Sequence, residues 1–310
     1  MKLLLAAANE GNPDSQNALG DIFSDSSRQE KDIAVAVKWY GMAAEQGHLE
    51  AQYSLAGLLA NEPDVMDETA ALEWYRHTAE QGHSKAQYTL GAMCEFAKGV
   101  PQDLEAALKW YRLSADQGDV QAQYKTGHML RHGLGTPQDA GKAAEYFNLA
   151  SRLGHAESLY ALGLQYFDGT GVSRDIEKAA EYYQKAAEQG HTGAQYNLAQ
   201  MHRMGQGKTA QIKQAKRWYE MAAQKGLVQA QFNLGMLCYV GKPAPKDPCS
   251  AFMWWTIAAS EGDQQAEKNL TLLMKEIDQQ DMKQGLSLAT AWVEKFGNRE
   301  ALLEFSKNFA

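Results

Sequence analysis

The sequence predicts an all-α solenoid of about seven tandem two-helix units. Two observations predict it: a glycine recurs every 36 residues, with one interval of 35, and an aromatic pair recurs within each period. A self-similar period of roughly 20–50 residues is typical of stacked supersecondary units that share one continuous core. The glycines are Gly47, Gly82, Gly118, Gly154, Gly190, Gly226 and Gly262.

Each period contains two amphipathic helices. In the first, apolar residues recur at i, i+4 and i+8, as in Ala86, Leu90 and Cys94, which places them on one helix face. The second repeats the i, i+3, i+4, i+7, i+8 pattern, as in Ala179, Tyr182, Tyr183, Ala186 and Ala187. No stretch alternates apolar and polar residues, so no strand is predicted.

Turn and cap residues divide the helices. Each recurrent glycine follows a second helix, where the left-handed conformation ends helices. An aspartate stands where each of six second helices should begin, as a helix N-cap does. These are Asp32, Asp67, Asp103, Asp139, Asp175 and Asp247. Cys94 and Cys238 share one repeat position that is apolar in other units, so we expect them in the core rather than in a reactive site.

The composition narrows the classes of function. The chain has 310 residues and a net charge of −8, which argues against nucleic-acid binding because that needs a basic surface. No apolar run reaches the ~20 residues that span a bilayer, so no membrane partner is expected. Three cysteines are too few for a disulfide framework. We therefore expect a cytoplasmic protein, or a periplasmic or secreted one if a signal peptide precedes this chain.

The unit at 155–190 resembles the Sel-1-like repeat of the tetratricopeptide-like superfamily. The resemblance rests on Leu162-Gly163, Gly169-x-Gly171, Asp175, Tyr182-Tyr183 and Gly190. It implies a right-handed superhelix whose first helices line a concave groove. It also implies an adaptor or scaffold that binds a protein or peptide, without catalysis, cofactor or metal. The alternative that it implies is an immunity protein that neutralises a secreted bacterial toxin.

The repeats set the predicted boundaries. Residues 1–11 would be a remnant second helix acting as an N-terminal cap, and 263–310 a degenerate helix pair and tail acting as a C-terminal cap. Between them lie the units 12–47, 48–82, 83–118, 119–154, 155–190, 191–226 and 227–262. The first two units lack the usual loop glycine, at Ser24–Lys31 and Asn61–Asp64, so we expect differently shaped loops there. Ala301–Phe305, with Phe309, should form a short amphipathic helix that packs on the cap or lies in a groove.

Three patterns suggest chemistry, and each has a plainer interpretation. Gly205–Thr209 is similar to the end of a phosphate-binding loop but lacks its preceding glycine. His128 and His132 have the i, i+4 spacing of zinc ligands, which leaves a weak hydrolase or metal-dependent enzyme as an alternative. Arg131 would oppose a cation there. A histidine follows four turn glycines, and a turn role is expected for each: His48, His83, His155 and His191.

Partner binding is predicted on the first helices. The residues three, seven, ten and fourteen after each glycine share one helix face and vary from unit to unit, unlike the residues that build the core. The predicted contacts are Lys85, Phe96, Lys125, His128, His132, Leu164, Asp168, Asn197, Gln200, Met204, Asn233 and Met236. The face would be cationic near the fourth unit and more apolar toward the seventh. An acidic partner segment is therefore expected, for a monomer or weakly self-associating chain; a self-assembling solenoid is the alternative.

Overall fold

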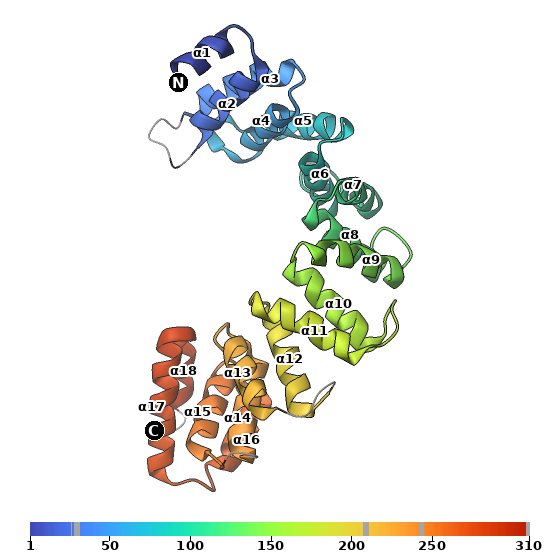
Figure 1. Ribbon diagram of the computed structural model, residues 1–310. Coiled ribbons are helices and arrows are strands. Elements are labelled where there is room, and N and C mark those ends of the chain that lie inside the picture. Colours follow the sequence, from blue (N-terminus) through green and yellow to red (C-terminus); the bar gives the residue numbers. More distant parts are fainter. Residues whose placement is uncertain (26, 28–31, 207–210, 242–244, 308–310) are drawn as a thin grey trace. The chain divides into compact units, whose positions relative to one another are not determined.

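The computed structural model describes all residues except 26, 28–31, 207–210, 242–244 and 308–310. The described residues form helices and no strand, which confirms the all-α prediction. The chain divides into two compact units, Met1–Leu153 and Gly154–Ala310. We call them the N-terminal and the C-terminal unit. In each, successive helices in the chain pack side by side as hairpins (Figure 1). The architecture is an α-solenoid of tandem helix pairs.

The N-terminal unit begins with α1 (Lys2–Asn9), which packs on α2. Its first helices are α2 (Pro13–Ser24), α4 (Leu49–Asn61), α6 (Ser84–Phe96) and α8 (Val120–His132). Its second helices are α3 (Ile33–Glu45), α5 (Glu68–Glu80), α7 (Leu104–Asp116) and α9 (Ala140–Arg152). The 3₁₀ turn η1 (Pro63–Val65) lies in the second loop, which confirms that this loop differs. Most of the first loop falls outside the described residues.

The C-terminal unit repeats this arrangement. Its first helices are α10 (Ala156–Asp168), α12 (Thr192–Met204), α14 (Val228–Val240) and α16 (Gln264–Leu273). Its second helices are α11 (Ile176–Glu188), α13 (Ile212–Ala223), α15 (Pro248–Ser260) and α17 (Gln279–Phe296), followed by α18 (Arg299–Ser306). One hydrophobic cluster extends from Leu159 to Leu302. Its core is therefore continuous through the last helix.

The aspartate N-caps and glycine turns that the sequence predicts for the helices are present. All six aspartates cap second helices; Asp175 Oδ1, for example, accepts the Lys178 N–H at 3.0 Å. At the turn after α3, Gly47 has φ +85° and the His48 N–H donates to the Ala43 carbonyl at 3.1 Å. This backbone bond satisfies a carbonyl that the helix end would otherwise leave unpaired.

The second residue of each aromatic pair packs over a small residue of the preceding first helix. A Cβ added to Gly163 would lie 2.5 Å from the Tyr183 ring, and one added to Gly235 would lie 2.4 Å from the Trp255 ring. The recurrent Leu-Gly pair therefore makes room for a ring that fills the hairpin interior. Both rings are buried, at 1% and 2% exposure.

A row of buried glutamines links neighbouring hairpins of the N-terminal unit. Gln87 Nε2 donates to the Ala79 carbonyl at 3.1 Å, and Gln87 Oε1 accepts from Gln117 Nε2 at 2.7 Å. Gln16 and Gln52 make the same pair of bonds. The row ends at Gln123, whose Oε1 is buried without a partner among the described atoms. Leu153 stands where the donating glutamine would be.

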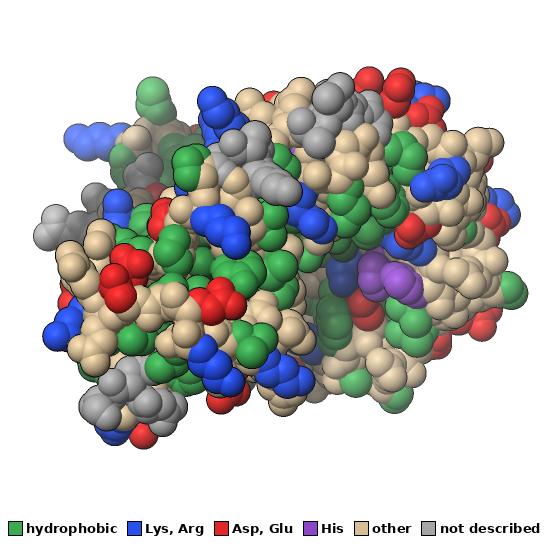
Figure 2. Space-filling model, turned by 90° about the horizontal axis from the view of Figure 1, so that it is seen from below, with side chains coloured by type: hydrophobic (Ala, Val, Ile, Leu, Met, Phe, Trp, Pro, Cys, Tyr) green, Lys and Arg blue, Asp and Glu red, His purple; other side chains and the backbone are tan. Residues whose placement is uncertain are grey.

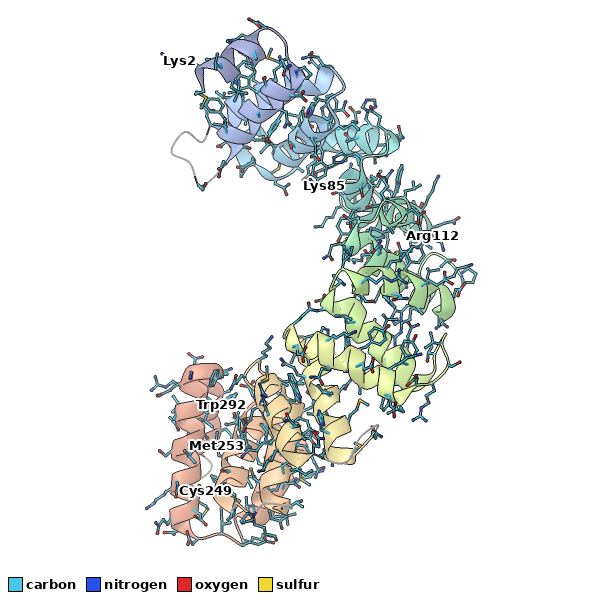
Figure 3. All side chains as sticks on the ribbon, viewed as in Figure 1. Lys2, Lys85, Arg112, Cys249, Met253 and Trp292 are labelled. Carbon is cyan, nitrogen blue, oxygen red and sulfur yellow. The ribbon has the colours of Figure 1, made fainter. Side chains whose placement is uncertain are left out.

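The C-terminal helices close the core. Figure 3 shows Cys249 and Met253 on α15 beside Trp292 on α17, and the Trp254 and Trp292 rings lie 5.4 Å apart. Leu302 of α18 is 2% exposed, so this tail helix packs on the cap, one of the two predicted arrangements. Phe309 lies outside the described residues.

Candidate partner-binding surface

We call the positions three, seven, ten and fourteen after each turn glycine the first-helix face. All twelve predicted contact residues are exposed or half-buried. Three units have a large apolar residue at the fourteenth position, and each of these side chains is about half exposed to water. They are Phe96, Met204 and Val240, at 56%, 52% and 47% exposure. One face position, Ala161, is buried at 6% exposure and is unavailable to a partner. In Figure 3, Lys85 lies on the first helix α6 and Arg112 on the second helix α7 of the same hairpin.

In the N-terminal unit, the face residue Lys125 forms a half-buried ion pair with Glu95. Lys125 Nζ lies 2.9 and 3.1 Å from the two carboxylate oxygens of Glu95, whose side chain is 13% exposed. Tyr111 Oη donates to the same carboxylate at 2.6 Å. Lys125 Nζ also lies 4.9 Å from the centre of the exposed Phe96 ring, a cation–π distance. These contacts fix Lys125 on the face.

This pair corrects the prediction of a cationic floor near the fourth unit. Glu95 neutralises Lys125, so that lysine is not a free positive charge for an acidic partner. His128 adds little charge, because burial and the neighbouring His132 and Lys125 lower its pKa, against the opposing effect of Glu95. Figure 2, which views the molecule from below, shows acidic and basic side chains interspersed with hydrophobic ones on that side.

His128 and His132 lie together, with ring centroids 4.6 Å apart. A zinc site needs three or four protein ligands. Within the described parts of the chain, no three His, Cys, Asp or Glu residues are grouped so that they could hold a metal ion. The two nearby cations, Lys125 and Arg131, both lower the pKa of His128. On the face, His128 is half-buried and His132 is exposed.

The C-terminal unit holds the other seven predicted residues, and several already have partners. Gln200 Oε1 accepts from Tyr219 Oη at 2.6 Å and from Arg203 Nε at 3.0 Å. Asn233 Nδ2 donates to the Gln229 carbonyl at 2.7 Å. Leu164 and Met236 pack against the core cluster. This leaves Asp168 and Met204 as the most exposed of the seven.

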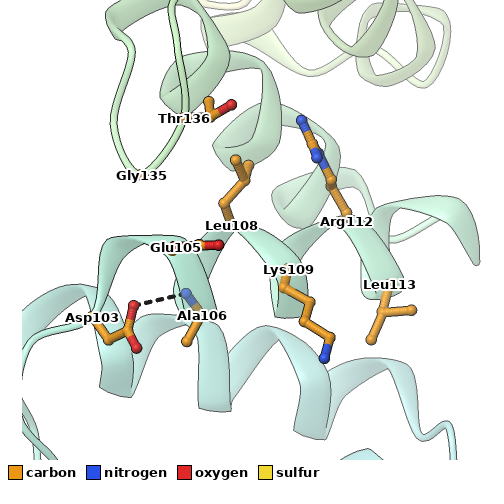
Figure 4. Close-up of a pocket in the computed structure, with 9 residues that line it drawn as sticks. All are labelled: Asp103, Glu105, Ala106, Leu108, Lys109, Arg112, Leu113, Gly135 and Thr136. Carbon is orange, nitrogen blue, oxygen red and sulfur yellow. Dashed lines mark hydrogen bonds between the residues drawn. The ribbon is translucent and has the colours of Figure 1, made fainter.

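A hollow of about 560 Å³ lies on the second-helix side, between α7 and the loop that contains Gly135 (Figure 4). Asp103, on its rim, caps α7 by accepting the Ala106 N–H at 2.9 Å, and Lys109 and Arg112 line the same hollow. None of these residues belongs to the first-helix face. The predicted cysteine assignments fit the structure: Cys94 and Cys238 are buried, and Cys94, Cys238 and Cys249 are free thiols.

The four turn histidines are helix N-caps, which confirms their turn role. Each Nδ1 accepts a backbone N–H of the following helix, as His191 does from Ala194 at 3.1 Å. Only a neutral imidazole offers a free acceptor nitrogen. Burial lowers the pKa of both His155 and His191, with Glu157 opposing it.

These two caps predict acid sensitivity. A pKa lowered by folding means that the unfolded chain takes up the proton first. Their contribution to stability is therefore complete above the ordinary histidine pKa of about 6.5 and is lost as the pH falls below it. We expect the free energy of unfolding, measured with urea, to decline between about pH 7.5 and 5.

The matched variant is His191→Asp, since Asp119 and Asp263 already cap the same position of other units. Asp keeps the cap and titrates near pH 4, so the decline should become shallower in this variant. A decline as steep as that of the wild type would contradict the assignment.

A model of the Sel1 repeat family matches residues 13–48, 49–83, 84–119, 120–155, 156–191, 192–227 and 228–263. Among solved structures, a Sel1 repeat protein from Oxalobacter formigenes is 31% identical, with a TM-score of 0.69 over 100% of this chain and 90% of its own. A protective antigen present in uropathogenic Escherichia coli strains, which displays the same repeat fold, is 26% identical, with a TM-score of 0.62 over 99% of this chain and 73% of its own.

An immunity protein from Pseudomonas aeruginosa is 25% identical over 76% of this chain and 83% of its own, but with a TM-score of 0.39 it carries no argument about function. No curated protein matches the chain. No helix in the described parts of the chain has the length and apolar character needed to cross a membrane. The seven matched repeats cover most of the chain and coincide with its helix pairs, and the chain therefore belongs to the Sel1 repeat family.

Proposed function

We propose that this chain is a non-enzymatic scaffold that binds a protein partner through its first-helix face. Sel1 repeat proteins generally mediate protein–protein interaction and are generally non-enzymatic. One observation supports the face in particular. The recurrent alanines, leucines and second aromatic residues of the repeat are buried in the hairpins, whereas the first-helix face positions vary and are mostly exposed or half-buried.

Exposed apolar residues make the fourteenth position the best anchor. Phe96, Met204 and Val240 each leave about half of the side chain in water. Large apolar and aromatic side chains in the middle of an interface contribute most of its binding energy. A partner that covers any of them would remove apolar surface from water, and in the C-terminal unit the repeat spacing of Met204 and Val240 would favour an extended or helical segment.

The proposal is tested with a triple variant, Phe96→Glu, Met204→Glu and Val240→Glu. The matched control changes three exposed leucines of second helices, Leu113→Glu, Leu149→Glu and Leu288→Glu, which are 40%, 43% and 40% exposed. We expect the partner captured by the wild type to be retained by the control and weakened at least about 10-fold by the face variant. A partner lost only with the control variant would move the binding surface to the second helices.

The immunity function is the special case in which the captured partner is a secreted toxin. Its identification in the same capture would establish that case. A partner of another kind would leave the scaffold function in place and exclude immunity.

A further inference from the structure

Three hairpins satisfy a buried tyrosine hydroxyl with a side chain of their own first helix. Tyr40 Oη donates to Asp21 Oδ1 at 2.7 Å, and Tyr111 Oη to Glu95 Oε2 at 2.6 Å. Tyr219 Oη donates to Gln200 Oε1 at 2.6 Å. In each hairpin the acceptor stands ten or thirteen residues after the turn glycine. A buried hydroxyl needs such a partner because an unpaired polar group in the interior is unfavourable.

Tyr75 occupies the same position in the second hairpin without an acceptor. Its residue is 6% exposed, and no described residue forms a hydrogen bond with its hydroxyl. The two acceptor positions are held by Gly57 and Ala60, which carry no polar side chain. A Cβ added to Gly57 would lie 3.6 Å from Tyr75 Oη. Burial raises the pKa of Tyr75 to about 12, so its hydroxyl remains a neutral donor.

A pocket of about 480 Å³ has Tyr75 and Ala60 in its wall. Its lining comes from α4, α5 and α6, and from Lys98 and Gly99 after α6. Thr89 and Ala92 are residues of the first-helix face, so the pocket belongs to that face. Asn61 Nδ2 donates to the Gly57 carbonyl at 2.8 Å, and Thr89 Oγ1 to the Lys85 carbonyl at 2.9 Å. The Tyr75 hydroxyl is therefore an uncommitted donor in the wall.

Lys98 and Glu68 are the charged residues that line this pocket. Lys98 is exposed and, within the described part of the chain, makes no ion pair. A carboxylate entering beside Lys98 and Tyr75 would meet the same two kinds of donor that Glu95 meets, namely a lysine ammonium and a tyrosine hydroxyl. Such charge-assisted hydrogen bonds are stronger than neutral ones.

We propose that this pocket receives an acidic side chain of the protein partner, whose carboxylate accepts from Tyr75 Oη and takes the place that Asp21 and Glu95 fill in other hairpins. The proposal rests on the proposed function, in that the partner covers the first-helix face. It locates the acidic contact in the second and third units, rather than at Lys125, which already has its own carboxylate.

The probe is N-acetyl-glutamate N-methylamide, titrated into the full chain and followed by NMR. N-acetyl-norvaline N-methylamide, which has an alkyl side chain and no acceptor, is the comparison. We expect the glutamate probe to bind with a Kd on the order of millimolar, as small ligands do, and the norvaline probe to bind at least about 10-fold more weakly. Equal affinities for the two probes would overturn the proposal.

Tyr75→Phe should weaken the glutamate probe at least about 10-fold and leave folding intact, because its hydroxyl has no partner to lose. Ala60→Glu should block the probe and raise the thermal midpoint, since it supplies the acceptor that Glu95 supplies to Tyr111. Tyr111→Phe is the matched control, expected to lower stability and leave probe binding unchanged. Unchanged affinity in Tyr75→Phe would contradict the pocket even if the face variant still loses the partner, so the two proposals fail separately.

Discussion

Replacing Trp255 with alanine is expected to lower the free energy of unfolding by about 3–5 kcal/mol, the usual effect of deleting a fully buried large ring. Trp255 is 2% exposed, and its ring lies directly over Gly235. A Cβ added to Gly235 would lie 2.4 Å from that ring, so no larger residue fits there. Its Nε1 donates to the Phe232 carbonyl at 3.3 Å, and its ring lies 5.4 Å from that of Tyr239. The cavity left behind would be lined by helices that stack on their neighbours, so it cannot collapse freely.

Urea unfolding followed by circular dichroism measures this loss. Trp74→Ala is the control, because Trp74 is also a member of an aromatic pair but is only half-buried. Its loss should be clearly smaller. Equal losses of stability would contradict the assignment of the ring over the glycine as the main packing element inside each hairpin.

The second large effect is expected at Gly135, in the loop before α9. Its φ is +67°, and an added Cβ would lie 2.2 Å from the Leu104 carbonyl oxygen at the start of α7 (Figure 4). The left-handed conformation costs an alanine about 1–2 kcal/mol, and the contact is with backbone that cannot move aside. We therefore expect Gly135→Ala to destabilise the chain by about 2–4 kcal/mol.

Gly118→Ala separates the two causes. Gly118 also has a positive φ, +93°, but nothing lies within 4 Å of the position of its Cβ. Gly118→Ala should lower the free energy of unfolding in urea only by the cost of the backbone conformation, about 1–2 kcal/mol. If Gly135→Ala lowers the free energy of unfolding no more than Gly118→Ala does, the loop that contains Gly135 is not held against α7.

Much of the fold could be predicted because residues that recur in every repeat mark the same structural position each time. The turn glycines, the capping aspartates and the apolar periodicity each identify a helix end or a buried face without any long-range information. Ala97 shows the limit of this reasoning. It takes φ +56° at the end of α6, where the α8 and α10 ends have Gly133 and Gly169, so the loop backbone is shared even where the glycine is not.

The candidate surface was harder to predict, because it depends on which side chains meet across hairpins. Periodicity located the exposed first-helix positions but not the pairing of Lys125 with Glu95, since the two residues are 30 positions apart. A comparison of the tenth and thirteenth positions would have identified both Glu95 as a partner of Tyr111 and the absence of one for Tyr75. In the second unit these two positions are Gly57 and Ala60, neither of which has a side chain that could accept a hydrogen bond.

The most direct test of the first-helix face is site-specific photocrosslinking to the partner. A photoreactive side chain is placed at Gln121 or Gln229, exposed residues of the face, and for comparison at Lys109 or Lys213, exposed residues of second helices. We predict adducts with the same partner from Gln121 and Gln229 and none from Lys109 and Lys213. Adducts only from the second-helix positions would contradict binding through the first-helix face.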